Sequence, residues 1–464
     1  KDLSKYDEIA IDLETKDPEL KTMGSGSVTG KGRIVGIALA VEDWSGYYPI
    51  AHEGGGNMDE QKVLKYFGMI LSLPARKIFH NAMYDVCFIR AAGLHIAGDI
   101  VDTMIAGSLV DENRFRYDLG SMGRDYLGKG KNEAILTETA KEWGIDAKSE
   151  MYKLPAMYVG EYAERDAEMT LELWQEMKKE IYSQDIEDIF KLESELFPCL
   201  VDMRFLGVRV DTEAAHKLKE ELVAEEKACL QKVKTETQVD VQIWAARSIE
   251  QVFQKLNLPY DRTEKTSAPS FTKNFLQNHP NPVVKNIARA REINKAHTTF
   301  IDTILKHSHK GRIHAEINQL RSDSGGTVTG RFSYSNPNLQ QIPARNKELG
   351  PKIRSLFIPE ENCKWGVFDY SQQEPRLVVH YAAIQNMYAA GDVLDAYKEG
   401  DADFHQIVAD MAEIPRDQAK TINLGLFYGM GKNKLQAELG VNKERANELF
   451  KQYHARVPFV KQLM

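Results

Sequence analysis

The chain has 464 residues, of which 42% are hydrophobic and 28% are charged, and at about 150 residues per domain this length predicts roughly three domains. Such a composition excludes a wholly disordered chain, a fibre and a disulfide-stapled miniprotein. The 60 Lys and Arg face 68 Asp and Glu, giving a formal net charge of −8, which excludes a protein that simply coats nucleic acid with a basic surface. Any nucleic-acid binding must use local basic clusters, leaving acidic residues for other tasks such as metal sites.

The cysteines and the N-terminus point to a reducing compartment. Cys87, Cys199, Cys229 and Cys363 are widely spaced, which predicts free thiols and no structural zinc. No stretch is apolar enough for a signal peptide or a membrane-spanning helix, so we expect a cytoplasmic protein without membrane contact. The missing initiator Met suggests that the sequence starts inside a longer chain.

Alternating apolar and polar residues predict strands in the first part of the chain. In residues 8–15, Asp12 and Glu14 fall on the face opposite Ile9 and Ile11. The whole pattern predicts one α/β domain over residues 1–185. Its other predicted elements are strands at 33–41, 46–52 and 77–80, a hairpin loop at 24–30 (GSGSVTG), and a helix from about residue 160.

Acidic residues on three of these segments form a candidate metal site. Asp12 and Glu14 alone are more typical of an exposed polar strand face than of a metal site. Asp85 follows the strand at 77–80, however, and Tyr162 and Asp166 are four residues apart on one helix face. Two divalent ions about 4 Å apart could share these four carboxylates, one activating a water and the other stabilising the leaving oxygen. The set therefore predicts two-metal phosphodiester hydrolysis, with Tyr162 orienting the water.

The segments DLET (12–15), HNAMYD (80–85) and YAERD (162–166) resemble the three exonuclease motifs of the DEDD superfamily, in its tyrosine subclass. This resemblance implies an RNase H-like fold and a 3′–5′ proofreading exonuclease that acts on a single-stranded 3′ DNA end. It implies two Mg²⁺ or Mn²⁺ ions held by Asp12, Glu14, Asp85 and Asp166, with Tyr162 as a further catalytic residue and Asn81 contacting DNA.

The rest of the chain changes character twice. Residues 186–310 are charged and mostly helical in pattern. Residues 310–354 are rich in Gly and Asn and carry eight Lys and Arg against three acids, which is typical of a solvated loop or of a loop that touches phosphates. The segment CKWGVFDY (363–370) predicts a strand that ends at Asp369, followed by a helix.

Residues 416–431 predict a helix with one stripe of special residues. Arg416, Lys420, Leu424 and Tyr428 recur every four positions. Two cations at one end would suit a triphosphate, and the aromatic ring would suit its base. An amphipathic core helix with a basic first turn explains the same pattern. Because basic residues there oppose the helix dipole, a bound anion would relieve a local cost.

Four segments together resemble DNA polymerase family A, the polymerase-I-like bacterial and phage replicases. They are TVTGRFSYSNPNLQQIPAR (327–345), DYSQQEPR (369–376), DFH (403–405) and RDQAKTINLGLFYGMG (416–431). This resemblance implies a right-hand polymerase domain that binds primer–template DNA and dNTPs and uses two Mg²⁺ or Mn²⁺ ions. In the family, DYSQQEPR resembles motif A and RDQAKTINLGLFYGMG resembles motif B. The expected domains are the exonuclease at 1–185, early palm and thumb at 186–310, palm with motif A at 311–400, and fingers with motif B at 401–464.

The polymerase resemblance also implies roles for single residues. Asp369, helped by the Tyr370 carbonyl, would hold the catalytic metals, and Glu374 would be the steric gate against a ribose 2′-OH. Lys420 would also protonate the leaving pyrophosphate. The remaining roles are nucleotide binding by Gln372, His405, Arg416, Lys420, Leu424 and Tyr428, and duplex contact near the primer end by Arg331, Asn338 and Gln340.

Three departures from the family pattern stand out. Position 375 is Pro, where the family usually has an apolar residue inside a helix, and Pro fits there if it lies in the first turn. Position 424 is Leu, where many relatives have an aromatic residue. No HDE-like third polymerase motif occurs before residue 464, so we expect a C-terminally incomplete polymerase with a C-terminal polymerase fragment as a further partner.

We therefore expect a phage-type, template-directed DNA polymerase with a proofreading exonuclease, working in DNA replication in the host cytoplasm. Whether this chain alone polymerises is left open. Two alternatives remain: an exonuclease whose polymerase-like half only grips DNA, and a non-enzymatic DNA-binding subunit of a replication machine.

Overall fold

A computed structural model describes residues 1–463 apart from residues 132, 264, 345, 401 and 402. The chain divides into two compact units, Lys1–Cys363 and Lys364–Met464. None of the described helices is both long and apolar enough to cross a membrane.

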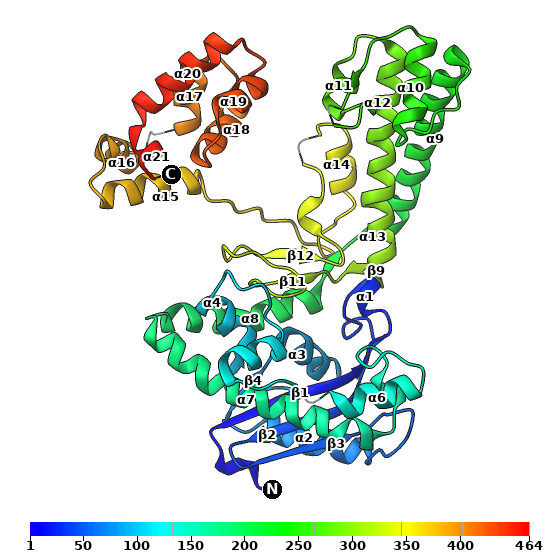
Figure 1. Cartoon of the computed structure of the whole chain (residues 1–464), viewed down its shortest axis with the longest axis vertical. Coiled ribbons are helices and arrows are strands. Elements are labelled where there is room, and N and C mark those ends of the chain that lie inside the picture. The colour runs from blue at the N-terminus through cyan, green and yellow to red at the C-terminus, as the bar shows by residue number, and fades with distance from the viewer. Residues whose placement is uncertain (132, 264, 345, 401–402, 464) are drawn as a thin grey trace. The chain divides into compact units, whose positions relative to one another are not determined.

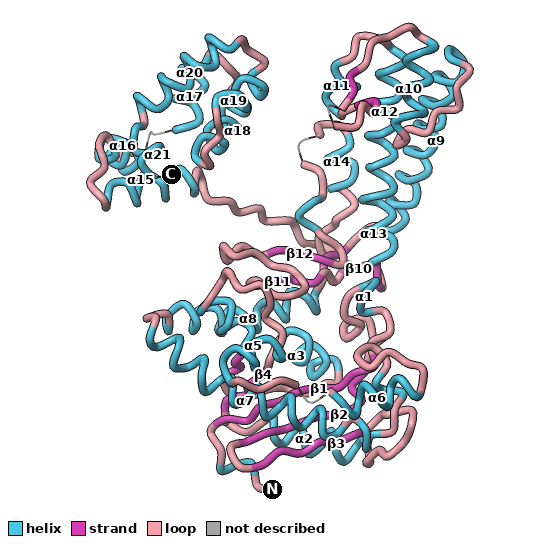
Figure 2. Tube along the Cα trace, viewed as in Figure 1, coloured by secondary structure: helices cyan, strands magenta, loops and turns pink. Residues whose placement is uncertain are grey.

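The first part of unit one is built on a five-stranded sheet with the strand order β3-β2-β1-β4-β5 (Figure 2). The central strand β1 pairs antiparallel with β2 and parallel with β4. The predicted strands are therefore present, although β3 ends at Pro49 and not at His52, because Ile50 and Ala51 both donate to the Val35 carbonyl and regular pairing stops there. The strands are β1 (Glu8–Lys16), β2 (Arg33–Val41), β3 (Trp44–Pro49), β4 (Arg76–Phe79) and β5 (Ile100–Asp102).

Helices cover both faces of this sheet (Figure 1). Ile9 and Ile11 of β1 pack with α2 (Glu60–Leu71), α3 (Ala82–Ala91) and α8 (Glu187–Leu206) in one core. Ala10, on the opposite face, packs in a second core with α4 (Thr103–Val110) and α7 (Gly160–Ser183). The other elements of this part are η1 (Leu3–Lys5), α1 (Leu20–Met23), α5 (Leu119–Met122), the π-helix η2 (Gly123–Leu127), α6 (Ala134–Glu142), η3 (Met151–Lys153) and η4 (Ala156–Tyr158).

The second part of unit one is mainly helical, as predicted for residues 186–310. The long helix α9 (Thr212–Thr237) packs along α12 (Pro282–Lys295) through apolar residues such as Leu222 and Ile287 (Figure 1). The other elements are β6 (Val208–Arg209), α10 (Ala246–Lys255), β7 (Asp261–Arg262), β8 (Pro269–Ser270), α11 (Lys273–Asn278), the π-helix η5 (Ala296–Ile301), α13 (Asp302–His307), β9 (Ser308–His309), β10 (Arg312–Ile313), β11 (Glu316–Asn318), β12 (Ser333–Ser335), η6 (Leu339–Gln341) and α14 (Leu349–Arg354).

The second unit is helical in its described residues, and the strand predicted at 363–370 is wrong. Residues 363–370 lie in an exposed irregular segment. A strand needs a hydrogen-bonded neighbour, and the described residues of this unit offer none. The helices are α15 (Gln373–Ile384), α16 (Ala390–Lys398), α17 (Phe404–Ala412), α18 (Arg416–Phe427), α19 (Lys432–Leu439), α20 (Lys443–Arg456) and α21 (Pro458–Leu463).

Candidate active site and nucleic-acid groove

The four predicted carboxylates come from three elements of the first sheet and its helices. Asp12 and Glu14 lie on β1, Asp85 on α3 and Asp166 on α7. Glu14, Asp85 and Asp166 are only 7%, 5% and 3% exposed, and Asp12 is half-buried. The Asp85 Oδ1 accepts a hydrogen bond of 3.0 Å from the Leu13 N–H. This bond fastens α3 to β1 between the two acidic positions of the strand.

The four carboxylates perturb one another. Burial raises the pKa of Asp12 to about 7, and the charge of Asp166 adds to this rise while Lys131 opposes it. Burial also raises the pKa of Glu14 well above its usual range, and the charges of Asp12 and Asp166 act in the same direction. The pKa of Asp85 is raised by burial and by the Asp12 charge. Electrostatic repulsion of this kind among buried carboxylates is typical of sites that bind a cation.

Lys131 supplies a positive charge to this cluster. Its Nζ is ion-paired with the Asp166 Oδ2, donates to the Tyr162 hydroxyl at 3.2 Å, and lies 5.2 Å from the centre of the Tyr162 ring. Burial acts to lower the pKa of Lys131, but the charge and hydrogen bond of Asp166 outweigh it and the pKa is raised. Burial raises the pKa of Asp166 despite the opposing charge of Lys131. Tyr162 and Asp166 therefore share one face of α7, as their spacing predicts.

The carboxylates suit a divalent metal in kind. All four offer the hard oxygen ligands that Mg²⁺ prefers, and the Asp166 Oδ1 is buried without a hydrogen-bond partner in the described part of the chain. As placed, however, no three Asp, Glu, His or Cys side chains among the described residues are grouped to hold one ion. The Lys131 ammonium already occupies the Asp166 Oδ2, so a metal ligated there must break that ion pair.

A fifth buried carboxylate, Asp102, shapes the turn that carries Asn81 and Asp85. Asp102 accepts hydrogen bonds from the N–H groups of Asn81 and Ala82 at 2.9 and 2.8 Å, and it caps α4 by accepting from Met104. Asn81 itself is exposed and has a left-handed φ of 66°. We did not identify Asp102 from the sequence, although an Asp before an apolar helical segment is a helix-start signal.

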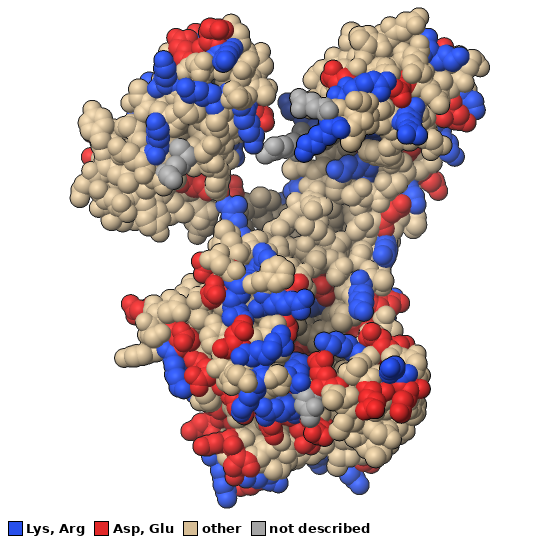
Figure 3. All heavy atoms as spheres, viewed as in Figure 1, with Lys and Arg blue, Asp and Glu red and all other residues tan. Residues whose placement is uncertain are grey.

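A basic groove adjoins this cluster. It has a volume of about 790 Å³ and is lined by residues of the α5–α6 region and by a loop near β11. Figure 3 shows Lys and Arg gathered on the visible face around α5. The lining of the groove also contains three acids and Phe115, which is 90% exposed. The lining cations are Arg116, Arg124, Lys131, Lys148 and Arg321.

The predicted duplex contacts lie in one segment of unit one. Asn338 caps η6 by accepting from the Gln340 N–H at 3.0 Å, and the Gln340 side chain donates to the Phe332 carbonyl at 2.9 Å. The Arg331 carbonyl accepts from Thr327 at 2.7 Å, and Arg331 is exposed. Arg345, one of the eight cations of the basic stretch, lies outside the described residues.

In the second unit, α18 carries three residues of the predicted stripe, and the fourth, Tyr428, is the C-cap because the helix ends at Phe427 and does not continue to residue 431. Arg416 begins the helix and its Nε donates to the Asp403 Oδ2 at 2.7 Å, while Lys420 is exposed and Leu424 half-buried. His405 is 3% exposed, burial lowers its pKa, and its Nδ1 lies 3.3 Å from the amide nitrogen of Asn423. The structure therefore gathers His405 and Arg416 around the start of α17.

Residues of the segment DYSQQEPR (369–376) form a second cluster. The Tyr428 hydroxyl donates to the Glu374 Oε1 at 3.1 Å, across 54 sequence positions. The Gln372 Oε1 accepts from the Tyr397 hydroxyl and the Phe404 N–H, each at 3.1 Å. Pro375 is buried in the first turn of α15, as expected. Asp369 and Tyr370 are exposed in the segment before α15, not at a strand end.

Comparisons with known proteins agree with both halves of this description. Residues 212–464 match the model of DNA polymerase family A, and residues 1–182 match that of a 3′–5′ exonuclease. The chain belongs to DNA polymerase family A. It carries an exonuclease domain followed by a polymerase domain, so the predicted fold class is confirmed.

Named relatives support this family assignment. A DNA-directed DNA polymerase of Pseudomonas phage M6 is 36% identical over 456 residues, covering 93% of this chain and 68% of the relative. The DNA polymerase DpoZ of Acinetobacter phage SH-Ab 15497 is 33% identical, covering 79% and 63%. DNA polymerase I of Pseudomonas aeruginosa is 29% identical, and this chain spans 50% of it.

The fold also resembles the POL domain of Pol1 from M. smegmatis in complex with DNA primer-template and dNTP. The TM-score is 0.74 at 20% identity, covering 99% of this chain and 74% of that chain.

Proposed function

We propose that this family A chain is a template-directed DNA polymerase with a 3′–5′ proofreading exonuclease that serves DNA replication, using two metals at each site. The observation that carries the exonuclease part is the buried cluster of Asp12, Glu14, Asp85 and Asp166, whose pKa values are all raised. Two Mg²⁺ or Mn²⁺ ions on these oxygens would supply the positive charge that phosphodiester cleavage needs. Tyr162, on the same helix face as Asp166, would hold the attacking water by its hydroxyl.

The basic groove is the proposed binding site of the single-stranded 3′ end. Five cations against three acids line it, and the exposed Phe115 ring offers a surface on which a base can stack. Lys131 belongs both to the groove and to the acidic cluster. A strand bound along the groove would thus be led toward the cleaving carboxylates.

The polymerase part is proposed to bind dNTPs on α18 and primer–template DNA near η6. His405, Arg416 and Lys420 offer nitrogens to phosphate oxygens, and the contact between Tyr428 and Glu374 would place the base-stacking ring beside the steric gate. Asp369 and the Tyr370 carbonyl would hold the metals. Arg331, Asn338 and Gln340 would contact the minor groove near the primer end.

The double variant Asp12→Ala with Glu14→Ala tests the exonuclease. Loss of two of the four ligands should abolish Mg²⁺-dependent degradation of a labelled single strand, while gel-shift affinity for the same strand stays within about twofold, because the groove cations are untouched. Glu42→Ala with Glu142→Ala removes two exposed carboxylates of the same domain and is the matched control. Degradation at the control's rate by the double variant would remove the assignment.

Primer extension with the four dNTPs separates the proposal from the exonuclease-only alternative. Template-dependent extension that is lost in Asp369→Ala supports the polymerase. Degradation without any extension supports a polymerase-like half that only grips DNA.

A further inference from the structure

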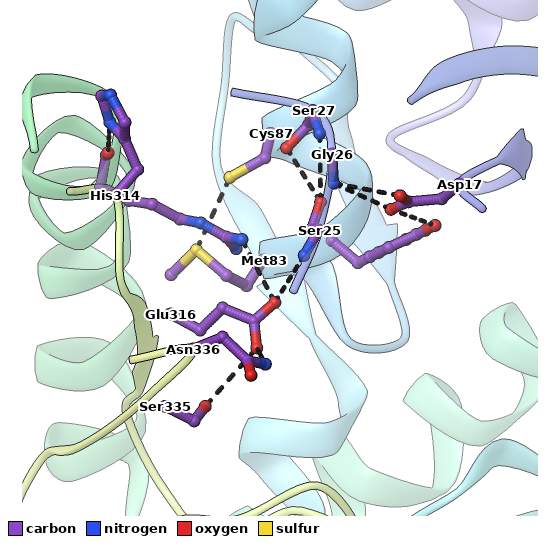
Figure 4. Close-up of polar contacts among 12 residues, drawn as sticks. Asp17, Ser25, Gly26, Ser27, Met83, Cys87, His314, Glu316, Ser335 and Asn336 are labelled. Atoms are coloured by element: carbon purple, nitrogen blue, oxygen red, sulfur yellow. Dashed lines mark hydrogen bonds and ion pairs between the residues drawn. The ribbon is translucent and has the colours of Figure 1, made fainter. Parts of the chain in front are cut away.

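The loop GSGSVTG (24–30) is held by two carboxylates of the protein itself (Figure 4). The Ser25 N–H donates to the Glu316 Oε1 at 2.8 Å, and the Gly26 N–H donates to both oxygens of Asp17 at 3.0 and 3.2 Å. Gly24 has a φ of +84°, and a Cβ there would lie 2.9 Å from the Glu316 Oε1. The loop sequence is therefore fitted to Glu316.

Glu316 joins this loop to segments far away in the chain. It lies on β11 and also accepts from Arg204 of α8 at 3.3 Å and from the Asn336 side chain at 2.9 Å. Arg204 is 4% exposed. A weaker contact of 3.5 Å comes from the Ser335 hydroxyl at the end of β12. One carboxylate thus connects the exonuclease loop, α8, β11 and β12.

The segments at the two ends of this network both carry proposed site residues. On one side, β1 bears Asp12 and Glu14 and leads directly to Asp17, which holds Gly26. On the other side, Asn336 leads within four residues to Asn338 and Gln340, the proposed primer contacts. A shift of the Asn336 segment relative to the exonuclease sheet must therefore break or stretch the contacts of Glu316.

We propose that Glu316 is a positioning residue that ties the exonuclease loop 24–27 to the primer-contacting segment 336–340 and thereby sets how readily a mispaired primer end reaches the exonuclease centre. This inference rests on the proposed exonuclease function. A single-stranded substrate does not need the segment 336–340, whereas a primer end on a template does. The two substrates should consequently respond differently when the tie is broken.

The test compares Glu316→Gln with the parent on two substrates, a single strand and a primer–template with two mispaired 3′ nucleotides. Gln keeps the shape of the Glu316 side chain but removes the negative charge of the carboxylate to which Arg204 and Asn336 both donate. We expect degradation of the single strand within twofold of the parent, and a fall in kcat/KM on the mispaired primer of about tenfold, the loss typical of one charge-assisted hydrogen bond. Glu236→Gln, an exposed carboxylate on α9, is the matched control and should change neither.

A second variant removes the contact between Asn336 and Glu316 by changing Asn336. Asn336 has a φ of 47°, so Asn336→Gly removes the amide contact without opposing this backbone conformation. It should reproduce the selective loss on the mispaired primer. An equal loss on both substrates in the two variants would make Glu316 a general structural residue, and unchanged rates on both would show no tie; either result overturns the inference.

Amide hydrogen exchange reports on the tie without any DNA. In Glu316→Gln, exchange should accelerate both in residues 24–27 and in residues 333–340, while α7 keeps the parent's protection. Loosening of only one of the two segments overturns the inference. If the parent protein degrades no DNA, the proposed function fails, and the exchange data still decide whether Glu316 joins the two segments.

Discussion

Lys131→Met is the sharpest test of how the acidic cluster is held together. The substitution keeps an unbranched side chain of similar length and removes only the positively charged ammonium group. The Asp166 side chain is 4% exposed and that of Lys131 is 20% exposed, so the ion pair is mostly shielded from water. In the variant, Asp166 loses this partner and Tyr162 loses a hydrogen bond of 3.2 Å.

The expected magnitude follows from this burial. Removing one partner of a buried ion pair typically costs about 3–5 kcal/mol, because the other charge is left uncompensated. Since Lys131 keeps some contact with water and Asp166 can take up a proton, we expect the lower end, a loss of about 3 kcal/mol in the free energy of unfolding at pH 7.5 in EDTA. Ion binding to the folded state alone raises its stability. Added Mg²⁺ should therefore restore more stability to the variant than to the parent, because in the parent the ion must first break the ion pair between Lys131 and Asp166.

Lys129→Met is the matched control for this experiment. Lys129 lies two residues away and pairs with Glu172 at 2.9 Å, but the two side chains are 48% and 37% exposed. Such a surface pair is worth about 0–1 kcal/mol. Urea unfolding, monitored by amide hydrogen exchange of residues in α7, measures the free energy of unfolding of the exonuclease domain in both variants. Equal stabilities of Lys131→Met and Lys129→Met in EDTA would refute the claim that Lys131 neutralises the cluster.

Three further predictions concern single groups. The pKa of Asp12 is about 7 in the folded protein and about 4 in an unfolded chain, so between these values the folded state holds a proton that the unfolded chain has lost. In EDTA the free energy of unfolding should therefore fall by at least about 1.4 kcal/mol per pH unit as pH rises from 5 to 7, because the raised pKa values of Glu14 and Asp85 act in the same direction. Urea titrations at each pH measure this slope, and a free energy that stays constant or rises would contradict the prediction. Tyr162→Phe should lower kcat for single-strand degradation by about 10²-fold with nearly unchanged strand affinity, because only the water-holding hydroxyl is lost; a normal kcat would exclude that role. Leu424→Tyr should raise the incorporation of dideoxynucleotides over deoxynucleotides in primer extension, because its hydroxyl can replace the missing 3′-OH; an unchanged ratio would place residue 424 away from the sugar.

Local patterns predicted most of the elements around the exonuclease cluster. The alternation of residues 8–15 identified β1, and the spacing of Tyr162 and Asp166 identified their common face on α7. These predictions succeed because side-chain direction in a strand or helix depends only on neighbouring residues. The same reasoning was wrong for residues 363–370, because alternation reports strand propensity and says nothing of a partner strand.

Residues whose roles depend on distant partners could not be predicted in this way. Lys131 meets Asp166 across 35 positions, and Glu316 meets Ser25 across 291. Neither has a distinctive local pattern, since a Lys in a Gly-rich stretch and a Glu in a short strand are ordinary. Asp102 carried a helix-start signal, but its hold on the Asn81 turn depends on β5 lying beside β4.

The distribution of charge explains how an acidic chain can suit DNA. Part of the excess of acids is placed where it does not repel a strand, because the exonuclease carboxylates are mostly buried and their raised pKa values favour protonation. The cations that face solvent in the groove outnumber the acids there by five to three. Since salt screens charges beyond about 10 Å, a bound strand responds to this local excess and hardly to the net charge of −8. Lys131 lies where the two regions meet, so the same ammonium that neutralises Asp166 also contributes to the groove.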